Sequence, residues 1–340
     1  MNTTLRRDIV CFGEVMTRLS APGHAQLASA TSLDLHVGGA EANVAVALAS
    51  LDHRAAMITA VPNGALGDGA CRFLRAAGVD LSHSFRSPGR QGLYFLSPGA
   101  SLRPSEILYD RTGSAFACAD WAAIDWSVAF GSARWLHVSG ITPALGPKLA
   151  VAVEAAMTAA RAAKMRISFD GNYRANLWQS WDSDPRTILT RLVRQADLFF
   201  ANHRDMALLL DRAFSNESEA RRREAALAGF EAFPNLKWIA STARHVETGD
   251  CHRLSARIDT PEASCQTAEV TVAGIVDRIG GGDAFAAGVL HGLIEEQSLK
   301  QTLEFGLKLA CLKHTVPGDA ALFNRADVET FSGDACDVRR

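Results

Sequence analysis

The distribution of hydrophobic residues along the chain predicts strands and helices in regular alternation. Short apolar runs, each long enough for one buried strand, occur at 7–13, 56–61, 134–138, 166–170, 197–201 and 237–241. Between them lie stretches with helical spacing, including 40–51, 146–164, 185–195 and 217–230. Residues 63–69 are expected to form a loop that leads into a further helix, which ends near Gly78. Strands that alternate with helices form a mostly parallel sheet with helices on both faces. The sequence therefore predicts an α/β fold.

Two stretches interrupt this alternation, at about 14–35 and 85–110. They contain short strand-like runs separated by proline and glycine breaks. We expect them to form a small β-sheet, inserted in a single domain of residues 1–340, that lies as a lid over a site. Residues 244–268 are polar and are expected to be irregular, and the residues after about 332 are expected to fray.

Composition and charge narrow the class of protein. The chain has 340 residues, 48% of them hydrophobic, with a net charge of −2, which argues against nucleic-acid and anionic-membrane partners. Seven scattered cysteines without a Cys-x-x-Cys pair favour a reducing compartment. No apolar stretch reaches membrane-spanning length, and we expect a cytoplasmic protein. The sequence also lacks a Walker A motif and a Gly-x-Gly-x-x-Gly motif after the first strand.

The most informative stretch is 273–288, in which Gly280, Gly281 and Gly282 precede Asp283 and a run of helix formers. A glycine turn that leads into a helix presents unpaired N–H groups at the positive end of the helix dipole, where a phosphate can bind. An aspartate there can accept the proton of a hydroxyl that attacks a phosphoryl group. The local pattern equally permits a helix cap and a tight turn.

Two separated motifs, Gly38-Gly-Ala-Glu-Ala-Asn43 and Asp277-Arg-Ile-Gly-Gly-Gly-Asp283, resemble the ribokinase-like (PfkB) carbohydrate kinases. Further stretches are similar to the 2-keto-3-deoxygluconate (KDG) kinase branch of that family: Arg103-Pro-Ser, Tyr109-Asp-Arg111, 135–143, Asp170-Gly-Asn-Tyr-Arg174, Leu177-Trp178 and 312–319. The resemblance covers residues 8 to 331.

The resemblance implies a ribokinase-like fold and an ATP- and Mg²⁺-dependent phosphotransferase. Asp283 would be the base that activates the sugar hydroxyl. The N–H groups of Gly280, Gly281 and Gly282 would form an anion hole for the transferring phosphoryl group. The product would be the 6-phosphate of KDG.

The resemblance also assigns the substrate side of the site. Residues expected around the sugar are Gly38, Gly39, Asn43, Tyr94, Tyr109, Arg111 and Arg174. A pair of arginines fits an acidic sugar, because a guanidinium binds a carboxylate with two hydrogen bonds.

For ATP the resemblance implies Asn172, Ser241, Thr242, Arg244 and Asp277, and for Mg²⁺, through water, Asn202 and Asp205. Three departures from the family pattern stand out. Residues 242–250 lack the usual glycine-rich run, Asp205 replaces a glutamate, and Arg278 replaces a small hydroxyl residue. Arg278 could reach a phosphate, or it could alter a loop that binds a monovalent cation in some relatives, so the sequence leaves potassium dependence open.

Two alternatives remain at this point. One is a PfkB kinase for another sugar, such as fructose, ribose or another keto-sugar. The other is a non-catalytic sugar-binding protein on the same fold. In either case, exposed edge strands of the lid favour a homodimer formed through the lids.

Overall fold

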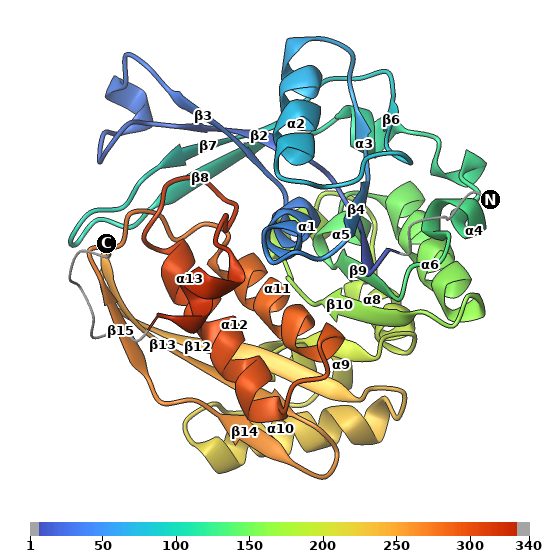
Figure 1. Ribbon diagram of the computed structural model, residues 1–340, viewed down its shortest axis with the longest axis vertical. Coiled ribbons are helices and arrows are strands. Elements are labelled where there is room, and N and C mark those ends of the chain that lie inside the picture. The colour runs from blue at the N-terminus through green and yellow to red at the C-terminus, as the bar shows by residue number, and fades with distance from the viewer. Residues whose placement is uncertain (1–6, 332–340) are drawn as a thin grey trace.

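The apolar runs form the centre of a large sheet in the computed structural model, which describes residues 7–331 (Figure 1). Within this range the sheet has nine strands: β1 (Ile9–Phe12), β4 (Ala55–Ile58), β9 (Trp135–Ser139), β10 (Arg166–Asp170), β11 (Leu198–Phe200), β12 (Trp238–Thr248), β13 (Cys251–Asp259), β14 (Ser264–Gln266) and β15 (Val270–Ala273). Their order is β14-β13-β12-β11-β10-β9-β1-β4, and β15 also pairs with β13. All pairs from β4 to β12 are parallel. The predicted α/β fold is thereby confirmed.

Helices cover both faces of this sheet. Successive residues of a strand point to opposite faces, so each strand contributes to two cores. In β1, Ile9 and Cys11 join one core, and Val10 and Phe12 join the other. The first core is completed by α1 (Ala40–Ser50), α2 (Ala65–Ala76), α11 (Gly281–Ile294), α12 (Leu299–Lys313) and α13 (Arg325–Glu329). The second is completed by α3 (Ala115–Cys118), α4 (Trp126–Phe130), α5 (Ile141–Ala144), α6 (Pro147–Ala162), α7 (Ala175–Trp178), α8 (Pro185–Val193), α9 (His203–Leu210) and α10 (Glu219–Ala232).

Helices α11 and α12 pack with their backbones in contact. A Cβ atom on Gly288 would lie 2.6 Å from the Cα of Gly306. This close approach needs glycine at position 288, whereas a Cβ on Gly306 would meet the side chains of Val289 and Phe285 at 3.0 and 3.1 Å. The contact brings the segment that follows α12 close to the start of α11.

The predicted small sheet is confirmed as a separate four-stranded sheet with the order β3-β2-β7-β8. Its strands are β2 (Met16–Ser20), β3 (Asp34–Gly38), β7 (Gly92–Ser97) and β8 (Glu106–Asp110). In Figure 1 this lid projects from the upper left of the molecule, away from the large sheet. Strand β3 runs to Gly38, beyond the predicted end of the lid. Residues 85–86 belong instead to a two-stranded pair, β5 (Ala60–Val61) with β6 (Phe85–Arg86).

The prediction for residues 244–268 was wrong. They form most of the antiparallel hairpin β12–β13 and the strand β14. The second half of β12 is exposed, whereas β13 is largely buried. The polar residues of β12 therefore belong to a half-solvated strand, which antiparallel edges of a sheet allow.

Two predictions from the sequence concern membrane-spanning segments and the C-terminal residues. No helix within residues 7–331 is long and apolar enough to span a membrane. The expected fraying after residue 332 concerns residues outside the described range.

Candidate active site

The glycine turn before α11 is held against the segment that follows α12. Gly280 adopts a left-handed conformation (φ 81°), and a Cβ there would lie 1.8 Å from the carbonyl oxygen of Asp319. Only glycine fits this position. Helix α11 then begins at Gly281, two residues before Asp283. The Gly281 N–H makes one long hydrogen bond, 3.3 Å, to the Arg278 carbonyl, and the following N–H groups are those that a helix start leaves unpaired.

Asp283 lies in the first turn of α11, and its carboxylate accepts a 2.6 Å hydrogen bond from the Asn43 amide. Burial, together with the negative charges of Asp170 and Asp319, raises the pKa of Asp283 to about 8, although the bond from Asn43 lowers it. A carboxylate with a pKa near the working pH is suited to take a proton from a hydroxyl.

A cavity of about 440 Å³ lies between the lid and the start of α11. It brings together most residues that the sequence assigned to the sugar and to phosphoryl transfer: Gly39, Asn43, Tyr94, Tyr109, Asn172, Arg174, Arg244, Gly280, Gly281, Gly282 and Asp283. Gly39 has φ 141°, and a Cβ there would lie 2.2 Å from the Glu14 carbonyl oxygen. The chain can therefore turn from the lid into α1 only with glycine at this position.

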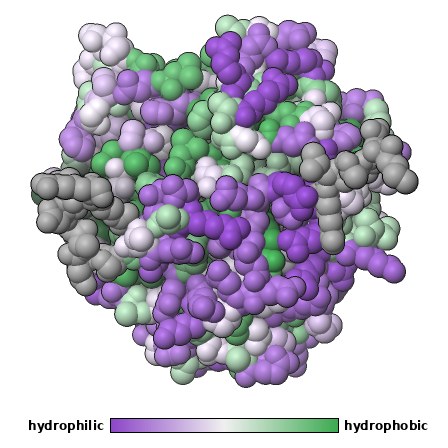
Figure 2. Space-filling model, in the orientation of Figure 1, coloured by the Kyte–Doolittle hydropathy of each residue, from purple (hydrophilic) through white to green (hydrophobic). Residues whose placement is uncertain are grey.

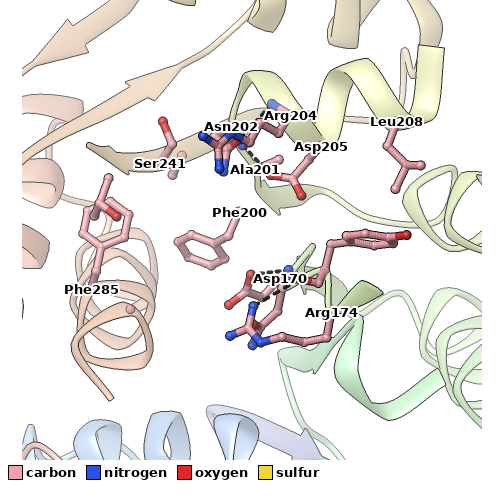
Figure 3. Close-up of a pocket in the computed structure, with 15 residues that line it drawn as sticks. Asp170, Arg174, Phe200, Ala201, Asn202, Arg204, Asp205, Leu208, Ser241 and Phe285 are labelled. Carbon is pink, nitrogen blue, oxygen red and sulfur yellow. Dashed lines mark hydrogen bonds between the residues drawn. The ribbon is translucent and has the colours of Figure 1, made fainter. Parts of the chain in front are cut away.

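A second cavity, of about 570 Å³, adjoins the first and shares Asp170, Asn172, Arg174 and Gly282 with it. The residues predicted for Mg²⁺ and part of the ATP site line it: Asn202, Asp205, Ser241 and Thr242. In Figure 3, Phe200 and Phe285 lie on one side of this cavity, and Asp170 and Arg174 lie below Asp205. The two cavities together give room for a sugar and a nucleotide that meet near Gly282.

Three predicted residues do not line either cavity: Gly38, Arg111 and Asp277. The Arg111 side chain is 6% exposed, and its Nε donates a 2.9 Å hydrogen bond to the buried carboxylate of Glu14. Asp277 accepts hydrogen bonds from Arg18 and from the Gly318 N–H. The side chains of Arg111 and Asp277 are therefore buried outside the two cavities and do not line them.

A buried polar network near the lid was missed at the sequence level. Arg18 of β2 bridges Asp277 and Asp319, at 2.8 Å from the latter, and the Tyr94 hydroxyl also donates to Asp319. Asp319 lines the first cavity. Because these residues are far apart in the chain, no local pattern could have grouped them.

Three arginines around the first cavity have no carboxylate partner among the ion pairs of residues 7–331: Arg174, Arg244 and Arg278. Burial and the positive charge of Arg278 lower the pKa of Arg244, so two like charges face each other here. Such an arrangement attracts a polyanion. That Arg278 lines the cavity fits the possibility, raised from the sequence, that it reaches a phosphate.

The residues of the second cavity fit a divalent cation. Burial and the nearby Asp205 carboxylate raise the pKa of Asp170 to about 7, and burial also raises the pKa of Asp205. One Asp205 oxygen accepts from the Asn202 N–H at 2.8 Å. Carboxylate oxygens of this kind are what Mg²⁺ prefers, directly or through water, and a cation would relieve their mutual repulsion. Asp170 closes a buried strand, which is the signal that could have identified it.

A second cluster, of His53, His291 and Glu295, lies toward the far end of α11. The two histidine rings share a 2.8 Å hydrogen bond, and Glu295 forms an ion pair with Arg325 at 3.1 Å. Every group of the cluster thus has a protein partner, and the cluster joins α11 to the segments around it.

The fold and the site together define a small-molecule phosphotransferase: a mostly parallel sheet, a small sheet beside the cavity, a glycine turn at a helix start, and a carboxyl group in the first turn of that helix. The pfkB family of carbohydrate kinases matches residues 6–232 and 261–325, and the chain belongs to this family.

Individual relatives agree with this assignment. The chain is 32% identical to a 2-dehydro-3-deoxygalactonokinase of Haloferax volcanii, over 96% of this chain and 98% of the relative. It is 29% identical to a 2-dehydro-3-deoxygluconokinase of Bacillus subtilis, over 93% and 92%. The crystal structure of a 2-dehydro-3-deoxygluconokinase from Thermotoga maritima superposes with a TM-score of 0.90 at 33% identity, over 95% and 98%. The protein is thus a kinase with a sugar acceptor, related to the 2-dehydro-3-deoxy sugar kinases.

Proposed function

We propose that the protein transfers the γ-phosphoryl group of ATP to the terminal 6-hydroxyl of 2-keto-3-deoxygluconate. The observation that carries this proposal is the meeting of the Asp283 carboxyl and the α11 N-terminus in a cavity lined by unpaired arginines. Kinases named for 2-dehydro-3-deoxy sugars among the relatives support the choice of substrate.

The chemistry follows from the positions of the groups. The Asp283 carboxylate takes the proton of the sugar hydroxyl as its oxygen bonds to the γ-phosphorus, and the bond from that phosphorus to the ADP oxygen breaks. The N–H groups at the start of α11 stabilise the negative charge on the phosphoryl oxygens. Asn43 holds the base in position with its 2.6 Å hydrogen bond.

Charge supports an acidic sugar. Arg174 lines both cavities and donates one hydrogen bond, 3.2 Å, to the neighbouring Tyr173 carbonyl. Its positive charge partly offsets the rise in the pKa of Asp170 and of Asp205, but among residues 7–331 it forms no ion pair with a carboxylate, so its guanidinium can bind the carboxylate of a sugar acid. Arg111 can reach the substrate only by leaving Glu14. We propose Arg174 as the main contact of the sugar carboxylate, and Tyr94 and Tyr109 as walls of the sugar site.

The second cavity is proposed for the nucleotide. Its backbone and side-chain polar groups at Asn172, Ser241 and Thr242, together with Arg244 of the first cavity, suit phosphates. Asp170, Asn202 and Asp205 would hold Mg²⁺, which neutralises phosphate charge. A fold relative from E. coli, 19% identical, is named as a complex with ATP and Mg²⁺.

A second substrate deserves equal testing. The Haloferax volcanii relative is named for the galactonate epimer, and it covers nearly the whole chain. The two sugar acids differ in the configuration of one carbon, so the same arginines suit both. Discrimination between the two sugar acids must then come from contacts between the protein and the hydroxyl group on that carbon.

The test is ADP release with Mg-ATP against both 2-keto-3-deoxy sugar acids, gluconate, fructose and ribose, with Asp283→Asn beside the wild type. We expect turnover with the 2-keto-3-deoxy acids only, and a loss of about a thousandfold in the variant. Preference for the galactonate epimer would correct the substrate. Turnover with a neutral sugar alone would contradict the proposal that the substrate is a sugar acid. Binding of a sugar acid without turnover would favour a non-catalytic sugar-binding protein.

We further propose a homodimer formed through the lids. Leu35 of β3 and Leu108 of β8 are exposed on the lid sheet, at 55% and 61%, and these two strands are its edges. Figure 2 shows hydrophobic side chains more often in the upper half of this view, around the lid, than in the lower half. Light scattering should give twice the monomer mass, and Leu108→Lys should reduce it; a monomeric wild type would refute the proposal.

A further inference from the structure

Lys313 is a buried lysine at the last residue of α12. It is 0% exposed and is among the largest fully buried side chains of the described residues. Lysine rarely lies inside a protein unless its ammonium group is matched by polar partners. Here the ammonium donates hydrogen bonds to two backbone carbonyl oxygens, of Asp277 at 3.2 Å and of Val316 at 3.3 Å.

These two carbonyls belong to the two loops that shape the anion hole. Asp277 opens the loop that ends in Gly280 and α11. Val316 lies in the turn after α12, which carries Gly318 and Asp319. The Val276 N–H bonds to the His314 carbonyl at 2.9 Å, and the Gly318 N–H bonds to the Asp277 carboxylate at 3.0 Å. The Lys313 ammonium therefore completes a clamp between the loops.

Charge gives the ammonium a second role. The carboxylates of Asp277 and Asp319 are both buried and share one guanidinium, that of Arg18. Burial lowers the pKa of Lys313, and the same two carboxylates oppose this change. With Lys313 charged, two positive groups balance two negative ones. Without it, an unbalanced negative charge would remain beneath the glycines that bind phosphate.

We propose that the Lys313 ammonium is a covalently attached cation that holds the loop of residues 277–280 in its phosphate-binding form. Carbonyl oxygens from two loops, with carboxylates close by, are ligands for a monovalent cation, the ion that this loop binds in some relatives. In this chain the Lys313 ammonium already occupies the Asp277 and Val316 carbonyl oxygens, and its positive charge would repel a potassium ion there. These residues therefore do not form a potassium site. The kinase then works without added potassium, and Lys313 is a positioning residue. This inference rests on the phosphotransfer reaction and not on the identity of the sugar.

The first test uses the wild-type protein with Mg-ATP and the sugar that it phosphorylates best. Turnover is measured with tetramethylammonium as the sole monovalent cation, and then with sodium, potassium or ammonium at equal ionic strength. We expect the same kcat in all four salts. A kcat that rises several-fold with potassium or ammonium would overturn the proposal.

The second test removes the attached cation. Lys313→Ala leaves a space at the two carbonyls, and we expect kcat to fall about a hundredfold because the anion hole is displaced. Potassium or ammonium should restore much of it in a saturable way, whereas tetramethylammonium, which is too large, should not. Lys313→Met fills the space with an uncharged chain and should show the same loss without recovery. Lys300→Met, on the exposed side of the same helix, should behave as wild type.

A third measurement is independent of turnover. The melting temperature of Lys313→Ala should rise with ammonium concentration beyond the rise seen for Lys313→Met, and that of the wild type should not. If no sugar is turned over, the proposed function fails, and the melting temperatures still decide this point. If Lys313→Ala does not fold, the wild-type salt comparison decides it. A folded Lys313→Ala that no cation stabilises or activates would show that Lys313 is only a packing residue.

Discussion

Two groups of arginines surround the same site and differ in how they are paired. On the lid side, Arg18 and Arg111 are buried and bound to carboxylates. On the side of the helix start, Arg174, Arg244 and Arg278 line the cavities without a carboxylate partner among the described residues. Buried arginines that already have partners maintain a structure, whereas arginines left unpaired at a cavity wall are available to an anion. Residue type and position in the chain do not reveal this difference, because it depends on the partners.

The largest expected effect is on stability, at Arg18. Arg18→Met leaves Asp277 and Asp319 buried without their guanidinium, which should lower the free energy of unfolding by about 3–5 kcal/mol. Urea denaturation measures this. The matched control is Arg212→Met, which breaks an exposed pair with Glu224 and should cost at most about 1 kcal/mol. Equal effects of the two variants would contradict the distinction.

Arg111 and Arg174 were predicted as equivalent, and the structure separates them. Arg111→Met should lower the free energy of unfolding by about 3 kcal/mol, because Glu14 stays buried and one of its oxygens already has no partner. Arg174→Met should leave stability nearly unchanged and raise KM for the acidic sugar. A stable Arg111→Met protein that has lost only its affinity for the sugar acid would mean that Arg111 exchanges Glu14 for substrate.

Arg244 and Arg278 should affect turnover without affecting folding. Replacing either by methionine should reduce kcat/KM for ATP about tenfold to a hundredfold, the value of one or two charge-assisted hydrogen bonds. The melting temperature should stay the same or rise, because each substitution removes one of two positive charges that repel each other. A loss of stability with unchanged turnover would place them with the paired arginines.

Two further predictions concern pH and the base beside the unpaired arginines. Since Asp283 has a pKa of about 8 in the free protein, kcat/KM should rise with pH and level off above about 8, as the carboxyl loses its proton. A flat profile between pH 6 and pH 9 would contradict this assignment.

The same pKa predicts a pH-dependent stability. A carboxyl whose folded pKa lies above its unfolded value of 3.8 favours the folded state at low pH, and this contribution is lost as the pH rises to about 8. Asp283→Asn should therefore melt higher than wild type, by a margin that grows with pH in this window. A margin that shrinks with rising pH would show the opposite shift.

Much of the fold followed from the sequence, because alternating buried strands and alanine-rich helices leave a clear period. The hairpin β12–β13 could not be predicted in this way. The second half of β12 is polar and exposed, and such a sequence resembles a loop as long as its partner strand is unknown. In the site, the glycine turn and Asp283 are local in sequence, and the structure places both at the start of α11 as the pattern predicts; their part in phosphoryl transfer stays a prediction. The partners of Arg111, the network of Arg18 and the burial of Lys313 join distant segments, and only the three-dimensional structure reveals them.

The backbone contact between Gly288 and Gly306 has a consequence for motion. Sliding of α11 along α12 would bring side chains of one helix against the backbone of the other, so we expect the start of α11 and the end of α12 to move together. We therefore expect any closure over a bound sugar to come from the lid, which joins the core next to Gly39. In amide hydrogen exchange, the two helices should therefore be the slowest part of the molecule, and a bound sugar should slow the lid strands far more than the helices.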